Sequence, residues 1–304
     1  MDYVLKTNGL CKEYRGFKAL NGLSMNVPEG SIYGFVGRNG AGKTTLIRLL
    51  CGLQEPTGGR LELYGKNWND KDIVKSRRRI GAVVETPSIY LDMTAEENLI
   101  YQYRLIGLPG YDTVPELLKL VGLGNTGKKK AKNFSLGMRQ RLGIAVALCG
   151  SPDLLVLDEP INGLDPQGIV EVRELILKLN REQKITVLIS SHILDELSKL
   201  ATHYGFIDSG RIVREMSADE LETACRKCVR IGVTDIRVLV TVLEKMGVEY
   251  RLIDGQNADI YAKPNITRLV TELAAKNCEV LSYNEHDEDL EGFFISLVGG
   301  KDHE

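Results

Sequence analysis

The sequence has no long apolar run. Its 304 residues are 43% hydrophobic and 26% charged, which is ordinary for a globular protein, yet no stretch approaches the roughly 18 apolar residues that span a bilayer. The longer apolar runs, such as 144–149, fall far short of that length. The first residues also lack a basic region followed by an apolar stretch, so we expect no secretion signal. Any path through a membrane would therefore belong to another chain.

Net charge and cysteine content exclude further classes. The formal net charge is −2, so nothing indicates nucleic acid as a partner, because that partner requires a basic surface. The short basic runs 77–79 and 128–130 have acids nearby and indicate solvated surface. The six cysteines are scattered, as in a reducing compartment. Cys225 and Cys228 form the only Cys-x-x-Cys pair, and because a zinc ribbon needs two such pairs we expect idle or buried thiols.

The order of predicted elements indicates an α/β fold with a mainly parallel sheet. Residues 2–30 alternate apolar and polar side chains between glycines, which predicts antiparallel strands at the amino terminus. Strands that alternate with helices then predict a parallel sheet covered by helices. The predicted strands are 32–36, 80–84, 154–157, 185–190 and 204–207. A helical stretch at about 90–150 interrupts this alternation and reads as an inserted helical subdomain.

The pattern changes after residue 215. Short strands are predicted at 229–233, 249–252, 258–261 and 279–283, and amphipathic helices at 236–246 and 266–275. We therefore predict two domains, one at 1–215 and a small accessory α/β domain at 216–304. The role of the second domain is left open.

A glycine-rich loop, Gly37-Arg-Asn-Gly-Ala-Gly-Lys-Thr44, follows a predicted strand and precedes a predicted helix. That context distinguishes a phosphate loop from a glycine turn before an ordinary helix. Its glycines let backbone amides face phosphates at the positive end of the helix. Lys43 is predicted to bridge the β- and γ-phosphates, and the Thr44 hydroxyl to ligate Mg²⁺.

Polar residues end two of the apolar strands. Asp158 and Glu159 end the strand at 154–157, and Asp158 is predicted to hold Mg²⁺. In isolation the pair could be solvated acids. His192 follows the strand at 185–190, where a lone histidine could be structural. Ser135 precedes a helix and could serve simply as its cap, although a capped helix end also binds anions.

Six motifs stand in one order along the chain, and together they resemble the ATP-binding subunit of ABC transporters from about residue 2 to about residue 215. They are Lys12-Glu-Tyr-Arg-Gly-Phe-Lys-Ala-Leu20, the phosphate loop, Phe134-Ser-Leu-Gly-Met138, Leu154-Leu-Val-Leu-Asp-Glu-Pro160, Asn162-Gly-Leu-Asp165 and Ser190-Ser-His192. The resemblance implies a P-loop NTPase cassette that binds ATP and Mg²⁺ and hydrolyses ATP.

The resemblance also assigns residue roles. Glu159 would polarise the attacking water, and His192 would contact the γ-phosphate. Tyr14 would stack on adenine, the alternative being a core tyrosine. The nucleotide-binding residues implied are Tyr14, Gly37, Asn39, Gly40, Gly42, Lys43, Thr44, Thr45, Ser135, Gly137 and Asp165.

Two kinds of partner follow from the same resemblance. In the family, the motif around Ser135 and Gly137 closes over ATP held by the opposite subunit, and Asp165 would stabilise that interface. A second nucleotide-binding subunit, identical or closely related, is therefore expected. An integral-membrane permease is the other expected partner and would hold the chain at the cytoplasmic face of the membrane.

The sequence departs from the family pattern at two motifs. Leu-Ser-Gly-Gly-Gln is replaced by Phe134-Ser-Leu-Gly-Met138, which keeps the serine and the second glycine. Glu85 stands where most relatives have a glutamine that meets Mg²⁺ and the lytic water. A glutamate can still bind metal or accept from water, but it adds charge and loses an amide donor.

Glu85 and the segment 85–99 resemble the bacitracin and lantibiotic self-protection exporters. Export of peptide antibiotics is therefore the leading hypothesis. A transporter for another substrate, such as ions, lipids or small drugs, and a non-transport ATPase stay open. A two-cassette translation factor would need a second phosphate loop, a DNA-repair ATPase a long coiled coil, and a GTPase an Asn-Lys-x-Asp motif, and the sequence has none of these.

Overall fold

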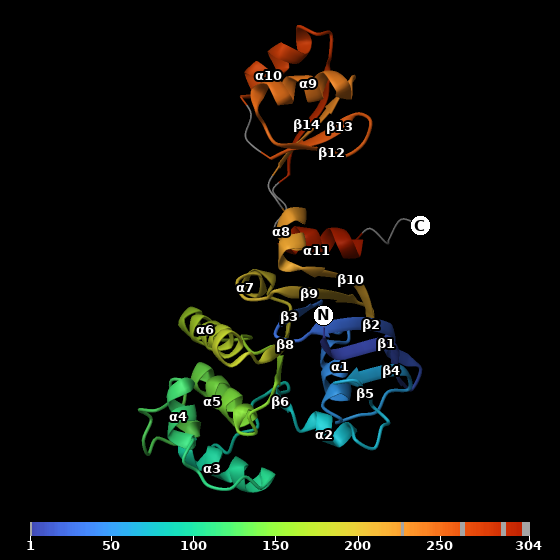
Figure 1. Ribbon diagram of the computed structural model, residues 1–304. Helices are drawn as coiled ribbons and strands as arrows, with labels where there is room; N and C mark the ends of the chain where they lie inside the picture. The colour runs from blue at the N-terminus through green and yellow to red at the C-terminus, as the bar shows by residue number, and fades with distance from the viewer. Residues whose placement is uncertain (1, 226–227, 262–264, 287–289, 300–304) are drawn as a thin grey trace. The chain divides into compact units, whose positions relative to one another are not determined.

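The computed structural model describes residues 2–225, 228–261, 265–286 and 290–299. By its internal contacts the chain divides into two compact units, Met1–Ala218 and Asp219–Glu304. Figure 1 labels their helices and strands. Among the described residues, no helix has both the length and the apolar character that crossing a bilayer requires.

The first unit is built on a six-stranded sheet with the strand order β10-β9-β3-β8-β7-β6. Its members are β3 (Ile32–Val36), β6 (Ile80–Val83), β7 (Leu154–Asp158), β8 (Thr186–Ser191), β9 (His203–Asp208) and β10 (Arg211–Ser217). All neighbours pair in parallel except β9 and β10. Every residue of β3, β7 and β8 is buried, which explains their continuous apolar runs. The predicted mainly parallel sheet is confirmed.

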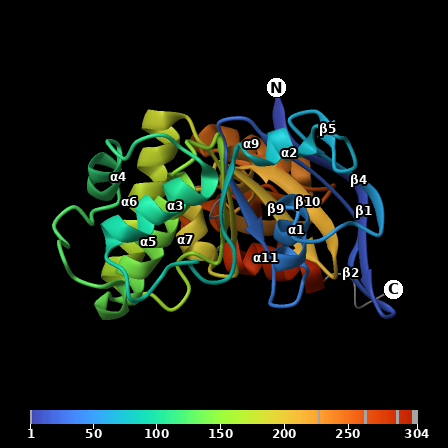
Figure 2. The same ribbon diagram turned by 90° about the horizontal axis from the view of Figure 1, so that it is seen from below.

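A second, antiparallel sheet in this unit has the order β2-β1-β4-β5. It contains β1 (Tyr3–Tyr14), β2 (Phe17–Pro28), β4 (Gly58–Leu63) and β5 (Lys66–Asn67). Helix α1 (Lys43–Leu50) lies between the two sheets (Figures 1 and 2). Its buried Leu46, Ile47, Leu49 and Leu50 share one core with residues from both sheets. This packing fixes the start of α1 at the end of β3.

Helices cover the opposite side of the parallel sheet (Figures 1 and 2). The main ones are α3 (Ala95–Ile106), α4 (Val114–Leu120), α5 (Leu136–Leu148) and α6 (Pro166–Gln183), and the shorter helices of the unit are α2 (Ile73–Arg77), η1 (Ala131–Asn133) and α7 (Leu194–Ser198). Helix α3 begins with a capping box between Thr94 and Glu97, which satisfies amides that the first turn leaves free. Helices α3 to α5 occupy the predicted helical insertion.

The second unit contains a succession of strand, helix, two strands, helix and strand. The elements are β11 (Cys228–Val233), α9 (Ile236–Met246), β12 (Tyr250–Leu252), β13 (Asn257–Ile260), α10 (Ile266–Ala274) and β14 (Val280–His286). Its sheet has the order β12-β13-β11-β14, with every pair antiparallel. That arrangement is a split β-α-β fold. Helix α8 (Ala218–Ala224) begins at the boundary between the units, and α11 (Leu290–Gly299) follows the sheet.

The core of this second unit lies between its sheet and two amphipathic helices. Leu239, Val242 and Leu243 of α9 and Leu269 and Leu273 of α10 are buried. They form one cluster with alternate residues of the strands, among them Val229, Ile231, Ala258 and Ile260. The apolar residues that recur with helical spacing in the sequence are therefore the ones that these two helices bury.

Candidate nucleotide site

The glycine loop connects β3 to α1 and fits tightly between β2 and β9. A Cβ atom on Gly37 would come within 2.6 Å of the Ile207 carbonyl oxygen, and one on Gly42 within 2.6 Å of the Ala19 carbonyl oxygen. Gly42 also has φ = 111°, a left-handed conformation that side chains disfavour. Glycine is therefore required at both positions, and the loop is held where a backbone cradle for phosphate is expected.

Lys43 opens α1 and turns its ammonium group back onto the loop. The side chain is only 6% exposed. Its Nζ donates to the carbonyl oxygens of Gly37 at 2.6 Å and Arg38 at 3.2 Å. It also lies 3.2 Å from Glu159 Oε1, an ion pair that lacks the geometry of a hydrogen bond. A buried cation thus stands at the centre of the loop. Thr44 and Thr45 follow it and are half-buried.

Asp158 is the last residue of β7 and is almost fully buried. Its Oδ1 accepts a hydrogen bond of 2.6 Å from the Ser190 hydroxyl on β8. Its Oδ2 is buried and has no hydrogen-bond partner among the described residues. Because an unpaired buried oxygen is costly, this atom is suited to a cation.

Glu159 follows Asp158 in a strained conformation. Its φ of 49° lies in the left-handed region, which is unfavourable for a residue with a side chain. Its amide donates to the Ser190 hydroxyl at 3.0 Å, so Ser190 holds both acidic residues. Glu159 Oε2 lies 2.8 Å from His192 Nδ1. Lys43, Glu159 and His192 therefore converge from α1, the end of β7 and the end of β8.

Ser135 and Asp165 form a second group at the starts of two helices. Ser135 Oγ accepts from the Met138 amide, and Asp165 Oδ1 accepts from the Gly168 amide, each at 3.2 Å. Both residues are helix caps, as the simpler interpretation of Ser135 proposed. A Cβ on Gly137 would lie 3.5 Å from Gly168 Cα. The glycines thus let α5 and α6 approach closely, with their positive ends side by side.

The polar contacts of Tyr14 and Glu85 are with Gln54 and Arg48, which were not among the predicted site residues. Tyr14 ends β1, donates its hydroxyl to Gln54 Oε1 and is 37% exposed, so it is not a core tyrosine. The Glu85 carboxylate forms an ion pair with Arg48 of α1. Asn39 and Gly40 are exposed at the tip of the loop. Ser190 and Arg48 were not singled out in the sequence, although Ser190 belongs to the same motif as His192.

Two cysteines outside the Cys-x-x-Cys pair have limited access to solvent, since Cys51 is half-buried and Cys149 is buried. Burial raises the pKa of both Cys51 and Cys149 to about 12. Both groups therefore stay protonated at neutral pH, where a thiol is a poor nucleophile and a poor metal ligand.

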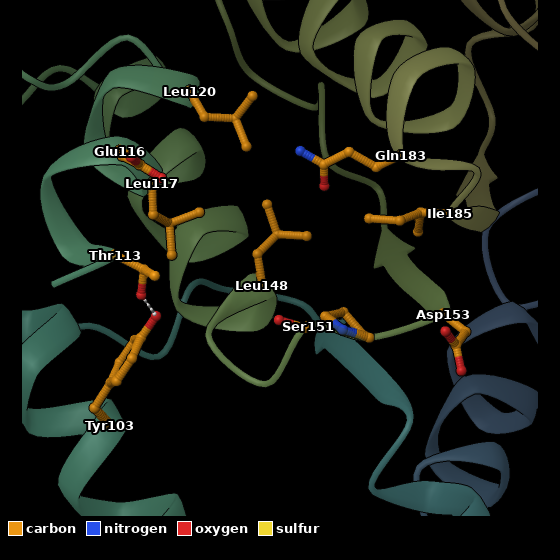
Figure 3. A pocket seen from close by; sticks show the side chains of 11 residues that line it. Tyr103, Thr113, Glu116, Leu117, Leu120, Leu148, Ser151, Asp153, Gln183 and Ile185 are labelled. Carbon is orange, nitrogen blue, oxygen red and sulfur yellow. Dashed lines mark hydrogen bonds between the residues drawn. The ribbon is translucent and has the colours of Figure 1, made fainter. Parts of the chain in front are cut away.

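A separate cavity of about 510 Å³ lies in the first unit near the amino ends of strands β7 and β8. Residues 151–153, which precede β7, line it together with Gln183 and Ile185, which precede β8. Leu117, Leu120 and Leu148 point into it, and the Tyr103 hydroxyl lies 2.6 Å from Thr113 Oγ1 at its rim (Figure 3). Ligands of open parallel sheets bind at the carboxyl ends of the strands. The cavity therefore does not belong to the site of Lys43 and Glu159.

Comparisons with known proteins agree with this geometry. The ABC transporter family pattern matches residues 20–162. The Bacitracin transport ATP-binding protein BcrA of Bacillus licheniformis is 42% identical, over 99% of both chains. The Lantibiotic transport ATP-binding protein SrtF of Streptococcus pyogenes is 44% identical, over 72% of this chain and 93% of its own.

A solved structure resembles the fold as well. It is an ATP-binding cassette in a dimeric post-hydrolysis state bound to ADP and Pi, with a TM-score of 0.62 and 28% identity, covering 70% of this chain and 98% of its own. The predicted P-loop cassette fold and the predicted ATPase are confirmed. The chain belongs to the ATP-binding, ATP-hydrolysing proteins of ABC transporters.

Proposed function

We propose that this ATPase uses Mg²⁺, pairs with a second nucleotide-binding subunit and powers a separate permease that exports peptide antibiotics. One observation supports the proposed catalytic site. Side chains from the carboxyl-end side of β3, β7 and β8 come together there, and they are those of Lys43, Asp158, Glu159 and His192. The substrate class is supported by two relatives, named for bacitracin transport and lantibiotic transport.

The residues present fit a magnesium ion. Asp158 Oδ2 is buried without a partner, and Thr44 lies on the first turn of α1 after the phosphate loop. No group of three or more histidine, cysteine or acidic side chains that could hold a metal occurs among the described residues. A cation here would instead use one carboxylate, a hydroxyl and phosphate oxygens, which is the ligand set that Mg²⁺ prefers. Bound there, the ion would neutralise charge on the phosphates.

Glu159 is the residue best placed to receive the proton of the attacking water. Its Oε2 bonds with His192, and its amide is held by Ser190. His192 therefore orients the carboxylate, and Ser190 fixes the backbone that carries it, before substrate arrives, which suits general-base catalysis. Lys43, beside Oε1, supplies positive charge where the γ-phosphate is expected.

A second subunit would use the group formed by Ser135, Gly137 and Asp165. Ser135 is exposed, and its helix presents a positive end next to that of α6. Such an end binds anions. We propose that it covers the nucleotide held by the partner's phosphate loop. A solved cassette that resembles this chain is dimeric in a post-hydrolysis state bound to ADP and Pi, which supports a second subunit.

The permease is the partner that would provide the membrane path. We propose that this chain docks on it at the cytoplasmic face of the membrane, as a peripheral subunit. The test is co-purification of the tagged chain from membranes with a multi-span protein, together with resistance of cells to a peptide antibiotic. Recovery of a multi-span partner without any effect on resistance would keep the transporter and reject the substrate class. Recovery of no membrane protein would reject the transporter itself.

A further inference from the structure

Glu85 occupies a strained turn at the end of an edge strand. The chain leaves β6 through a three-residue turn in which the Thr86 amide donates to the Val84 carbonyl oxygen at 2.8 Å. Glu85 is the central residue, with φ = 61°. This form of the γ-turn is rare and strained for a residue other than glycine. A glutamate held in such a turn indicates that the position of its side chain matters.

Arg48 fixes that position from α1. It pairs with the Glu85 carboxylate and lies four residues after Thr44 on the same helix. Residues four apart share one face of a helix, separated by about 6 Å along its axis. Arg48 therefore holds the carboxylate at the face of α1 that also carries Thr44, the residue whose hydroxyl is proposed to bind magnesium.

This pair adds little to stability. The Arg48 and Glu85 side chains are 37% and 55% exposed, and water screens ion pairs that are so exposed. Its consequence is electrostatic and local. A carboxylate released from Arg48 could approach the phosphate loop, where it would repel the phosphates of ATP. A carboxylate held by Arg48 carries a neutralising partner.

We infer that Arg48 is a positioning residue that keeps the negative charge of Glu85 away from the triphosphate until a cation accompanies it. The inference rests on the proposed nucleotide site and extends it. It assigns Arg48 a role in nucleotide binding without any contact with the nucleotide. It also predicts that the effect of Arg48 depends on Glu85 and on Mg²⁺.

The test is equilibrium binding of a fluorescent ATP analogue to the purified full chain, with Mg²⁺ and with EDTA. Arg48→Gln should weaken binding in EDTA by about three- to tenfold, because an unpaired carboxylate then lies near the phosphates. Binding with Mg²⁺ should change less than twofold. The double variant Arg48→Gln with Glu85→Gln should recover the affinity of the wild type in EDTA.

Arg79→Gln is the matched control. Arg79 pairs with Asp153, their side chains are 46% and 53% exposed, and the pair lies at the start of β6 and β7 rather than at their ends. Arg79→Gln should leave the affinity for the ATP analogue unchanged, both with Mg²⁺ and with EDTA. If Arg48→Gln binds like wild type in EDTA, or if Glu85→Gln fails to restore its affinity, Arg48 is only a surface partner. A wild-type chain that binds no ATP even with Mg²⁺ would instead refute the nucleotide site.

Thermal unfolding of each variant separates an unfolded sample from a weak binder. Should Arg48→Gln unfold, Arg48→Lys provides the second measurement, since lysine keeps the charge but loses the planar fork of donors. A smaller loss in EDTA, again removed by Glu85→Gln, would support the role of Arg48, and an unchanged affinity would contradict it.

Discussion

Glu85 and Glu159 stand at equivalent places in neighbouring parallel strands, yet their surroundings differ. Each lies two residues beyond a cross-strand pair, Val83 of β6 with Leu157 of β7, and each has a left-handed backbone. Glu159 is 20% exposed and is surrounded by Lys43 and His192. Glu85 is 55% exposed and pairs with Arg48. Their exposure differs because β7 is an interior strand of the sheet, whereas β6 is an edge strand.

The difference teaches that the same side chain at the same register can serve two purposes. An enclosed carboxylate with fixed partners is prepared for proton transfer, since its interactions are little screened by water. A carboxylate at the edge strand can change partners at low cost. We therefore expect Glu159 to control the chemical step and Glu85 to control how the site responds to its partners.

The largest expected effect is that of Glu159→Gln. The amide keeps the shape of the side chain but cannot take a proton, so hydrolysis should fall by about 10²- to 10⁴-fold. ATP binding should persist, and dimers should accumulate in the presence of ATP. Steady-state phosphate release and gel filtration measure the two effects, with Glu85→Gln as the control at the equivalent position. Near-normal turnover would place the base elsewhere and end the distinction between the two glutamates.

The next largest effects are expected from two variants, one of the buried Lys43 and one of the exposed helix cap Ser135. Lys43→Ala removes the ammonium group beside Glu159, so the isolated monomer should lose about tenfold or more in ATP affinity. Ser135→Arg should bind ATP as a monomer but fail to dimerise, because its action is across the interface. Monomer binding and ATP-dependent dimerisation are measured on both. Equal loss of monomer binding would contradict a site shared between two subunits.

The parts of this site that lie within one short motif could be predicted from the sequence, whereas contacts between distant segments could not. The phosphate loop, Asp158, Glu159 and His192 were predictable because each motif sets its own local geometry at the end of a strand. The contact of Ser190 with both acids, and of Arg48 with Glu85, joins segments that are distant in sequence. Only packing of α1, β6, β7 and β8 brings those side chains together, and no local pattern encodes it.

The fold shows the same division. Apolar runs predicted the buried strands to within a residue or two, since burial on both faces leaves a clear pattern. Strand β10 was not predicted, because its exposed positions alternate irregularly with half-buried ones. In the second unit the four strands and the helices α9 and α10 were predicted, whereas α8, α11 and the strand order β12-β13-β11-β14 were not. The departure from the family pattern at Leu136, which is 49% exposed, has no explanation in the contacts of this chain.

A smaller effect is expected of Glu85→Gln. The amide is neutral and weakens the pair with Arg48, but it still accepts hydrogen bonds. ATP binding with Mg²⁺ should persist, and ATPase activity should fall by less than about threefold. Export should fall more than hydrolysis if this strand end responds to the permease. Resistance of cells to a peptide antibiotic, measured alongside the ATPase rate of the purified complex, compares the two. Equality with wild type in both assays would make the glutamate a neutral replacement and would remove the main sequence support for a peptide-antibiotic exporter.

The smallest effect is expected from removing the second unit. Both glutamates, the phosphate loop and the group around Ser135 lie in Met1–Ala218, and β10 completes the sheet of that unit at Ser217. The second unit has its own apolar core. A chain ending at residue 218 should therefore fold and bind ATP with an affinity within about twofold of the full chain, since none of the binding residues is removed. Circular dichroism and the fluorescent ATP analogue measure this, and Glu159→Gln in the short chain should still abolish most hydrolysis in any dimer that forms. An insoluble short chain would mean instead that residues 219–304 are needed to complete the fold of the cassette, and the comparison of the two glutamates would then have to be made only in the full chain.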